Sequence, residues 1–236
     1  MSRLSGSDLD IPANVARVRE RIAAAAARAG RRAADIVLVA ASKTVDPDWI
    51  LAAAQAGMAD FGENYVQEAQ PKIARIGHGV RWHFVGHLQT NKAKQAVALF
   101  DIVQTVDSER LAAELDRRAH SAGRRLAVLL EVNTSGEETK FGVSPDETLR
   151  LAETVAGLEA LELKGLMTMG RLGVEPAEAR AGFALLRRVF DEVCRQLPGA
   201  EMAWLSMGMS GDFEVAIEEG SNMVRVGTAI FGPRPQ

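Results

Sequence analysis

Ile36-Val37-Leu38-Val39-Ala40-Ala41-Ser42-Lys43-Thr44 is the stretch that decides the fold of this chain. Its first six residues are apolar and half of them are β-branched, which predicts a strand buried on both faces. Such strands are typical of parallel sheets that helices cover on each side. Lys43 follows the strand at its carboxyl end, which is where parallel α/β proteins build their sites.

Lys43 at the mouth of a buried strand has two interpretations. In partly apolar surroundings an ammonium group loses its proton more easily, and the neutral amine that results can condense with an aldehyde. Alternatively, the side chain extends from the strand end into solvent, as charged side chains usually do. Position alone does not decide between these interpretations.

The pattern of a strand followed by a helix continues outward from this stretch. Apolar runs predict strands at residues 36–41, 59–61, 81–85, 102–106, 126–132, 161–166, 202–205 and 223–226. Helical spacing lies between them at residues 47–56, 66–76, 92–99, 109–122, 146–155, 177–196 and 213–219. An additional helix precedes the first strand, because Pro12 opens a helical pattern that ends at Gly30.

Eight strand–helix units with short connections predict an α/β fold of the TIM-type (β/α)8 barrel class, with an extra N-terminal helix and a single domain. We expect residues 1–10 to form a flexible N-terminus and residues 11–236 to form the barrel domain. The length of 236 residues is close to that of such barrels. An open doubly wound sheet is the alternative, but the first strand–helix turn lacks the glycine fingerprint of dinucleotide binding.

Composition excludes several classes of protein. A formal net charge of -3 gives no reason to expect nucleic acid or a membrane surface as a partner. The single cysteine, Cys194, excludes an internal disulfide and fits a reducing cytoplasm, and its helical surroundings favour a packed thiol over a nucleophile. No apolar run reaches membrane-spanning length, and the polar start is not a secretory signal. We therefore expect a soluble, cytoplasmic monomer.

The loops after the seventh and eighth strands are rich in glycine and hydroxyl groups. Residues 206–210 end with Ser210, and Gly227-Thr228 follows the last strand. Barrels often bind phosphate in these two loops through backbone N–H groups. The alternative is that the glycines only form tight turns, but both loops have suitable chemistry where the fold predicts it.

Arg225 is the third unusual residue, because it lies between Val224 and Val226 in a strand that we expect to be buried. A buried guanidinium needs a partner. That partner is either an acidic residue or a ligand, unless the side chain faces outward. Together, Lys43, Arg225 and the phosphate loops favour an aldehyde-bearing, aromatic, phosphorylated ligand, and pyridoxal 5′-phosphate (PLP) meets all three requirements.

The sequence resembles the pyridoxal-phosphate homeostasis protein family, whose fold is similar to the barrel domain of alanine racemase. The resemblance extends from about Val15 to the end of the chain. It rests on residues 38–44, 61–65, 82–92, 165–169, 205–212 and 225–232. The resemblance implies that Lys43 forms a Schiff base with PLP, that Arg225 faces the pyridine nitrogen, and that Ser210, Gly227 and Thr228 hold the phosphate. It also implies that Asn64 lies near the cofactor.

Other polar residues are weaker candidates for a site. His83 and His87 are four residues apart, but at a strand end this spacing does not align them for a metal, so we predict no metal site. Glu63 and His87 are candidate acids or bases for which structural hydrogen bonding is the simpler role. The loop of residues 136–140, with Lys140, either covers the site or is a solvated turn.

Two classes of function follow from the resemblance. The first is a non-enzymatic protein that binds PLP and buffers it or delivers it to apo-enzymes, with no catalytic residue. The second is a PLP-dependent enzyme similar to an amino-acid racemase. Arg225 favours the first class, because a guanidinium only donates and leaves the pyridine nitrogen unprotonated. The chain also ends at Gln236, directly after the eighth unit, so we expect no second domain to supply an opposing acid or base. A third alternative, a Schiff-base aldolase, leaves Arg225 unexplained.

Overall fold

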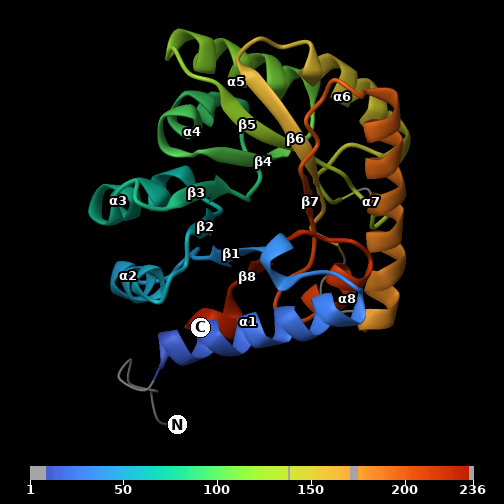
Figure 1. The fold of residues 1–236 in the computed structure, drawn as a ribbon. Coiled ribbons are helices and arrows are strands. Elements are labelled where there is room, and N and C mark those ends of the chain that lie inside the picture. The colour runs from blue at the N-terminus through green and yellow to red at the C-terminus, as the bar shows by residue number, and fades with distance from the viewer. Residues whose placement is uncertain (1–8, 138, 171–174, 234–236) are drawn as a thin grey trace.

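The computed structural model describes residues 9–137, 139–170 and 175–233, and within them the strands form a closed barrel. All of its strands are parallel and each pairs with its neighbours in chain order (Figure 1). They are β1 (Val37–Ala41), β2 (Asp60–Glu63), β3 (Arg81–Phe84), β4 (Ile102–Val106), β5 (Leu126–Glu131), β6 (Leu161–Met167), β7 (Trp204–Ser206) and β8 (Met223–Val226). The predicted barrel is therefore confirmed.

Helices surround the barrel and join one strand to the next (Figure 1). They are α1 (Ile11–Arg28), α2 (Pro47–Gln55), α3 (Val66–Ile76), α4 (Ala93–Leu99), α5 (Glu109–Ser121), α6 (Thr148–Ala156), α7 (Pro176–Gln196), α8 (Phe213–Glu218) and α9 (Thr228–Phe231). Short 3-10 helices lie at Ala33–Asp35, Thr90–Lys92 and Pro145–Glu147. The extra N-terminal helix that the sequence predicted is α1.

Closure of the barrel brings the first and last strands together. β1 pairs with β8 in a register that sets Val39 opposite Arg225. Because both strands are parallel, the residues that follow them meet at one end of the barrel. Lys43 and Gly227, which are far apart in the sequence, therefore face the same opening.

The N-terminal helix α1 is tied to the end of the chain. Asp10 caps it by accepting a hydrogen bond from the backbone N–H of Ala13 at 2.9 Å, and it packs against α8 and α9. The buried side chain of Asn14 donates to the carbonyl oxygen of Ile230 at 2.8 Å. Of the N-terminus that we predicted to be flexible, residues 1–8 lie outside the described residues, and the domain boundary stays a prediction.

The core has two parts. The larger cluster lies between the strands and the surrounding helices and contains the large side chains Trp82, Phe61 and Phe84. The smaller cluster consists of Val39, Leu129, Met167 and Met223, which come from four different strands. The apolar character of the strands on both faces follows from these two layers.

Two strands, β2 and β7, differ from their predicted ranges by two residues at one end. β2 continues through Gly62 and Glu63, because these residues pair with His83 and Phe84 of β3. β7 begins only at Trp204, opposite Gly165 of β6. A Cβ on Gly165 would lie 1.8 Å from the carbonyl oxygen of Trp204, so only glycine permits this approach.

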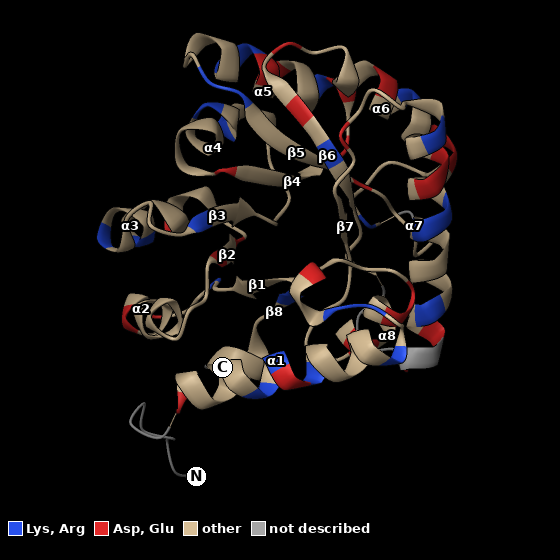
Figure 2. Ribbon diagram, in the orientation of Figure 1, with Lys and Arg blue, Asp and Glu red and all other residues tan. Residues whose placement is uncertain are grey.

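Charged side chains lie mainly on the outer helices. Figure 2 shows Lys and Arg interspersed with Asp and Glu along α1 and α7. This distribution fits amphipathic helices that bury one face against the barrel and leave the other in solvent. None of the helices in the described part of the chain is long and apolar enough to cross a membrane.

Candidate functional site

The carboxyl ends of the strands enclose a cavity of about 790 Å³ between β1, β2, β7 and β8. This volume lies within the usual range for small-molecule sites. The residues that we predicted to bind a cofactor all line it: Lys43, Asn64, Ser210, Arg225, Gly227 and Thr228. Segments that are far apart in the sequence therefore meet where the barrel fold predicts a site.

Lys43 projects from a turn directly after β1 and is half-buried. The next residue, Thr44, has a φ of 60°, which is uncommon for a residue other than glycine. Its backbone N–H donates a hydrogen bond to Glu68 Oε1 of α3. A helix side chain thus holds the turn that carries Lys43.

A buried ionic cluster around Lys72 stabilises this turn. Lys72 Nζ donates to the carbonyl oxygen of Ser42 at 2.7 Å, to Glu63 Oε1 at 2.9 Å and to Glu68 Oε1 at 2.6 Å. Ser42 Oγ also donates to Glu63 Oε1 at 2.7 Å. Burial raises the pKa of Glu63, although the attraction of Lys72 opposes this effect. The cluster joins the ends of β1 and β2 to α3 and fixes the direction in which the chain leaves β1.

Arg225 lies inside the barrel with 3% of its surface exposed. Its Nη1 donates to Ser206 Oγ at 2.5 Å, and its Nη2 donates to the carbonyl oxygen of Thr168 at 2.7 Å. Burial lowers its pKa to about 10, so the guanidinium is still protonated at neutral pH. Its side chain therefore presents a fixed cation to the cavity.

A chain of hydrogen bonds connects Arg225 to Asp60 of β2 through the interior of the barrel. Ser206 Oγ donates to Gln104 Oε1 at 2.7 Å, and Gln104 Nε2 lies 2.8 Å from His83 Nδ1. His83 Nε2 in turn lies 2.9 Å from Asp60 Oδ1. The ring of His83 thus links Gln104 to Asp60. Burial opposes ionisation of Asp60, but hydrogen bonds from His83 and Arg81 outweigh it and lower its pKa. The chain of hydrogen bonds ends at Asp60, whereas the carboxyl groups whose charge favours the protonated form of Arg225 are those of Glu131 and Asp212.

The loops after β7 and β8 meet at Ser210. Its Oγ accepts hydrogen bonds from the backbone N–H groups of Gly227 at 3.3 Å and Ala229 at 3.4 Å. Gly208 has a φ of 96°, and a Cβ there would lie 2.6 Å from the Cβ of Ala216. The sequence therefore needs glycine at this point to return the loop to α8.

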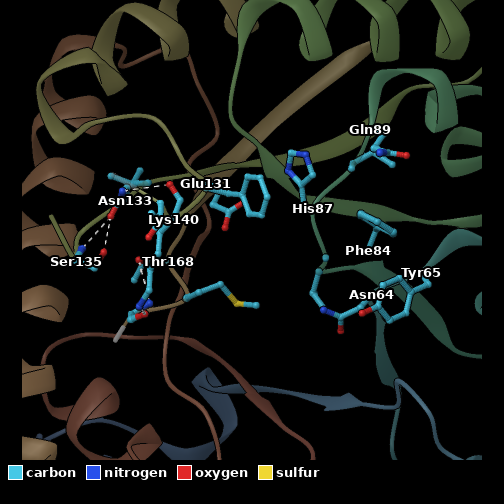
Figure 3. Close-up of a pocket in the computed structure, with 18 of the residues that line it drawn as sticks. Asn64, Tyr65, Phe84, His87, Gln89, Glu131, Asn133, Ser135, Lys140 and Thr168 are labelled. Carbon is cyan, nitrogen blue, oxygen red and sulfur yellow. Dashed lines mark hydrogen bonds between the residues drawn. The ribbon is translucent and has the colours of Figure 1, made fainter. Parts of the chain in front are cut away.

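A second cavity of about 630 Å³ adjoins the first and shares Asn64, Val85 and Met169 with it. Figure 3 shows Glu131, Asn133, Lys140 and Thr168 on one side and Asn64, Tyr65, Phe84 and His87 on the other. The ring of His87 stacks on Phe141, with the ring centroids 3.7 Å apart. Lys140 Nζ donates to the carbonyl oxygen of Gly170 at 3.1 Å, and Thr139, Lys140 and Phe141 line this cavity.

Glu131, at the end of β5, is the residue of this second cavity that the sequence analysis missed. It is 5% exposed, and its Oε2 has no hydrogen-bond partner among the described residues. Burial raises its pKa to about 7, and Asp107 adds to the effect while Arg225 opposes it. Glu131 is a charged residue at the carboxyl end of the most apolar strand, just as Lys43 follows an apolar strand, so the same sequence pattern could have indicated it.

The remaining candidates do not form a site together. His83 is fully buried in the hydrogen-bond chain, whereas His87 is exposed on the second cavity, and no group of three metal-binding side chains occurs among the described residues. Glu63 belongs to the cluster with Lys72. Cys194 is half-buried in α7, where burial raises its pKa, so the thiolate form is disfavoured.

Comparison with known proteins agrees with this arrangement. Residues 13–235 match the family described as the N-terminal domain of alanine racemase. The pyridoxal phosphate homeostasis protein of Vibrio cholerae is 39% identical over 229 residues, which cover 95% of this chain and 96% of that protein. The human pyridoxal phosphate homeostasis protein is 39% identical over 242 residues, which cover 97% of this chain and 88% of that protein.

A solved structure gives the same result. PipY of Synechococcus elongatus, solved with PLP bound, is 34% identical, with a TM-score of 0.83 over 94% of this chain and 100% of that chain. The similarity thus extends over sequence and fold and nearly the full length of each protein. The chain therefore belongs to the pyridoxal phosphate homeostasis protein family.

Proposed function

We propose that this protein binds PLP in the 790 Å³ cavity and takes part in the homeostasis of the cofactor, as a binding and buffering protein rather than a catalyst. The observation that carries the proposal is the meeting of Lys43, Arg225 and the Ser210–Gly227 contact in one cavity. These groups match the aldehyde, the pyridine ring and the phosphate of PLP. The names of the relatives and the PLP-bound PipY structure support the same ligand.

The chemistry of the donor set fits the cofactor. We assign Lys43 as the amine that binds the aldehyde covalently, and Arg225 as the donor that faces the pyridine nitrogen. Ser210, Gly227 and Thr228 would hold the phosphate, because a hydroxyl and backbone N–H groups converge there. Asn64 would lie beside the ring. When bound, PLP supplies an electrophilic carbonyl and an electron-withdrawing ring.

Arg225 is the main support for a role without strong turnover. Because its guanidinium only donates hydrogen bonds, a pyridine nitrogen facing it stays unprotonated and withdraws electrons less strongly. A racemase-like enzyme is the second candidate, and two observations favour it. The family match includes the alanine racemase domain, and Glu131 is a buried carboxyl group with a pKa of about 7 in the adjoining cavity.

We further infer that the protein works as a monomer in the cytoplasm and releases PLP to apo-enzymes. A single, half-buried cysteine suits a reducing compartment. To test delivery, the PLP-loaded protein is mixed with an apo-enzyme and reactivation is followed. Reactivation no faster than spontaneous release would leave buffering alone. Size-exclusion chromatography with light scattering tests the monomer.

The experiment that tests PLP binding is the visible spectrum of the purified protein with added PLP. We expect the absorption of covalently bound cofactor in the wild type and its complete loss in Lys43→Ala. Lys94→Ala, which removes an exposed lysine of α4, is the matched control and should keep the absorption. Borohydride reduction and peptide mapping should place the label on Lys43. A label mainly on Lys92 or Lys140 would contradict the assignment.

Turnover assays separate the two candidate functions. We expect the PLP-loaded protein to show no substantial racemase, transaminase or lyase activity on common amino acids. Activity that disappears in both Lys43→Ala and Glu131→Gln would replace the homeostasis role with that of an enzyme. Activity that is independent of Lys43 would indicate a contaminant.

A further inference from the structure

The second cavity differs from the first in the charge that it leaves unbalanced. Its volume of about 630 Å³ is enough for a small organic ligand. It shares Asn64, Val85 and Met169 with the proposed PLP cavity, so the two cavities open onto each other. A ligand in the second cavity would lie beside the group held in the first.

Two lysines, Lys92 and Lys140, line this cavity, and Lys140 already has partners. Lys140 Nζ donates to the carbonyl oxygen of Gly170 at 3.1 Å and lies 3.2 Å from Glu137 Oε1. A ligand anion would have to compete with both contacts. Lys140 is therefore a poor explanation for what the cavity binds.

The buried carboxyl group of the cavity is in the opposite situation. Glu131 is 95% shielded from solvent, since its exposed fraction is 5%, and its Oε2 lacks a hydrogen-bond donor among the described residues. Leaving a buried carboxylate oxygen without a donor is costly, so such an oxygen marks a position where a donor is expected. Figure 3 shows Glu131 on the wall of the cavity, facing the side that carries His87.

The opposite wall is suited to hydrocarbon. The stacked rings of His87 and Phe141 and the side chains of Phe84 and Val85 line the cavity around its polar wall. A ligand that satisfies both walls carries a hydrogen-bond donor with positive charge at one end and a short apolar chain at the other. These features define a small primary amine.

We infer that the second cavity is a binding site for a small primary amine, whose ammonium group pairs with Glu131 and whose hydrocarbon part lies against His87 and Phe141. The biological interpretation of this inference rests on the proposed function, because the amine would lie beside the site proposed for an aldehyde-bearing cofactor. The binding itself involves residues of this chain alone. It is therefore tested on protein without PLP.

The test is isothermal titration calorimetry of the PLP-free protein with n-propylamine, and with propan-1-ol and propionate as neutral and anionic analogues. We expect wild-type protein to bind the amine at least tenfold more tightly than either analogue. Glu131→Gln should lose that preference. Glu159→Gln, which removes one negative charge at an exposed position, should keep it.

Three outcomes would overturn the inference. Equal binding of the amine and the alcohol would show that no anionic partner is used. Tighter binding of propionate would assign the cavity to anions through Lys140. An unchanged amine affinity in Glu131→Gln would show that Glu131 does not bind the amine. If Glu131→Gln does not fold, Glu131→Asp is measured instead. PLP binding is measured in a separate titration of the same variants. If the proposed function is wrong, the wild type will not bind PLP, whatever the result with the amine.

Discussion

Glu63 and Glu131 are two buried carboxyl groups at the ends of strands: Glu63 contacts helix α3, and Glu131 lines the second cavity. Each is the last residue of its strand, β2 or β5, and each is buried. Burial raises the pKa of both carboxyl groups. Oε2 of each has no hydrogen-bond partner among the described residues, but Oε1 of Glu63 accepts hydrogen bonds from Lys72 and Ser42.

This difference separates polar groups that build the site from polar groups that remain for a ligand. Glu63 and Lys72 fix the turn that carries Lys43, and the chain from Asp60 to Ser206 fixes Arg225. Glu131 does not fix a neighbouring segment in this way, so its burial lowers the free energy of unfolding and stabilises no other part of the site. A buried carboxyl group that stabilises no neighbouring segment is typical of a binding position.

The largest effect is expected when Glu63 is made to resemble Glu131. Lys72→Met removes the buried cation and leaves Glu63 without its ionic partner, which should lower the free energy of unfolding by about 3–5 kcal/mol. Urea denaturation measures this loss. Lys94→Met, at an exposed position of α4, should change the value by no more than about 0.5 kcal/mol.

A double variant identifies the cause of that loss. If the uncompensated carboxylate is responsible, Glu63→Gln in the Lys72→Met background should restore part of the stability. No recovery would mean that Lys72 acts through packing or through its bond to the carbonyl oxygen of Ser42. A loss in Lys72→Met no larger than that in Lys94→Met would contradict the contrast between the two carboxyl groups.

The second effect has the opposite sign, because Glu131 is expected to destabilise the fold when it is ionised. Its pKa is about 7 in the folded protein against an ordinary value of 4.5, so the folded state binds more protons between these pH values. Stability that Glu131 contributes when protonated is therefore lost as pH rises from about 4.5 to about 7. The full difference corresponds to roughly 3 kcal/mol.

Glu131→Gln should remove this dependence. We expect the variant to match the wild type near pH 5 and to be more stable at pH 8, by an amount that approaches the value above. Denaturation curves at several pH values provide the measurement, with Glu159→Gln as the charge-matched control. Parallel curves for wild type and Glu131→Gln would mean that Glu131 has an ordinary pKa and a partner after all.

The contrast also explains what could be predicted from the sequence. Apolar strands and glycine-terminated helices repeat locally, so the barrel followed from patterns that span a few residues. Lys43 and Arg225 were recognisable because each interrupts or ends a buried strand with a charge. The residues Ser210, Gly227 and Thr228 followed from their loops, because barrels place phosphate sites there.

The partners of these groups could not be predicted in the same way. Lys72 lies in the middle of a helical pattern, where a lysine is ordinarily solvated, and only the packing of α3 against β2 buries it beside Glu63. The route from Arg225 through Gln104 to Asp60 depends on the register of strands around a closed barrel. Glu131 carried a local signal, but its unpaired oxygen appears only in three dimensions.

The smallest effect is expected at a hydroxyl group, where the same contrast recurs. Ser42 Oγ donates within the fold to Glu63, whereas Ser210 Oγ accepts from Gly227 and Ala229 and donates to no described acceptor. Ser210 therefore has a proton to offer the phosphate of PLP. Ser210→Ala should weaken PLP binding by roughly 1.5–3 kcal/mol, the usual contribution of a hydrogen bond to a charged group.

Pyridoxal without the phosphate distinguishes this role from a general loosening of the loop. Its affinity should be unchanged in Ser210→Ala, because the deleted hydroxyl has no phosphate to meet, and lower than that of PLP in the wild type. Thr228→Ala, on the adjoining loop, should reproduce the selective loss. If both variants weaken pyridoxal and PLP equally, the hydroxyls stabilise the loops rather than the ligand, and Ser210 belongs with Ser42 among the groups that build the site.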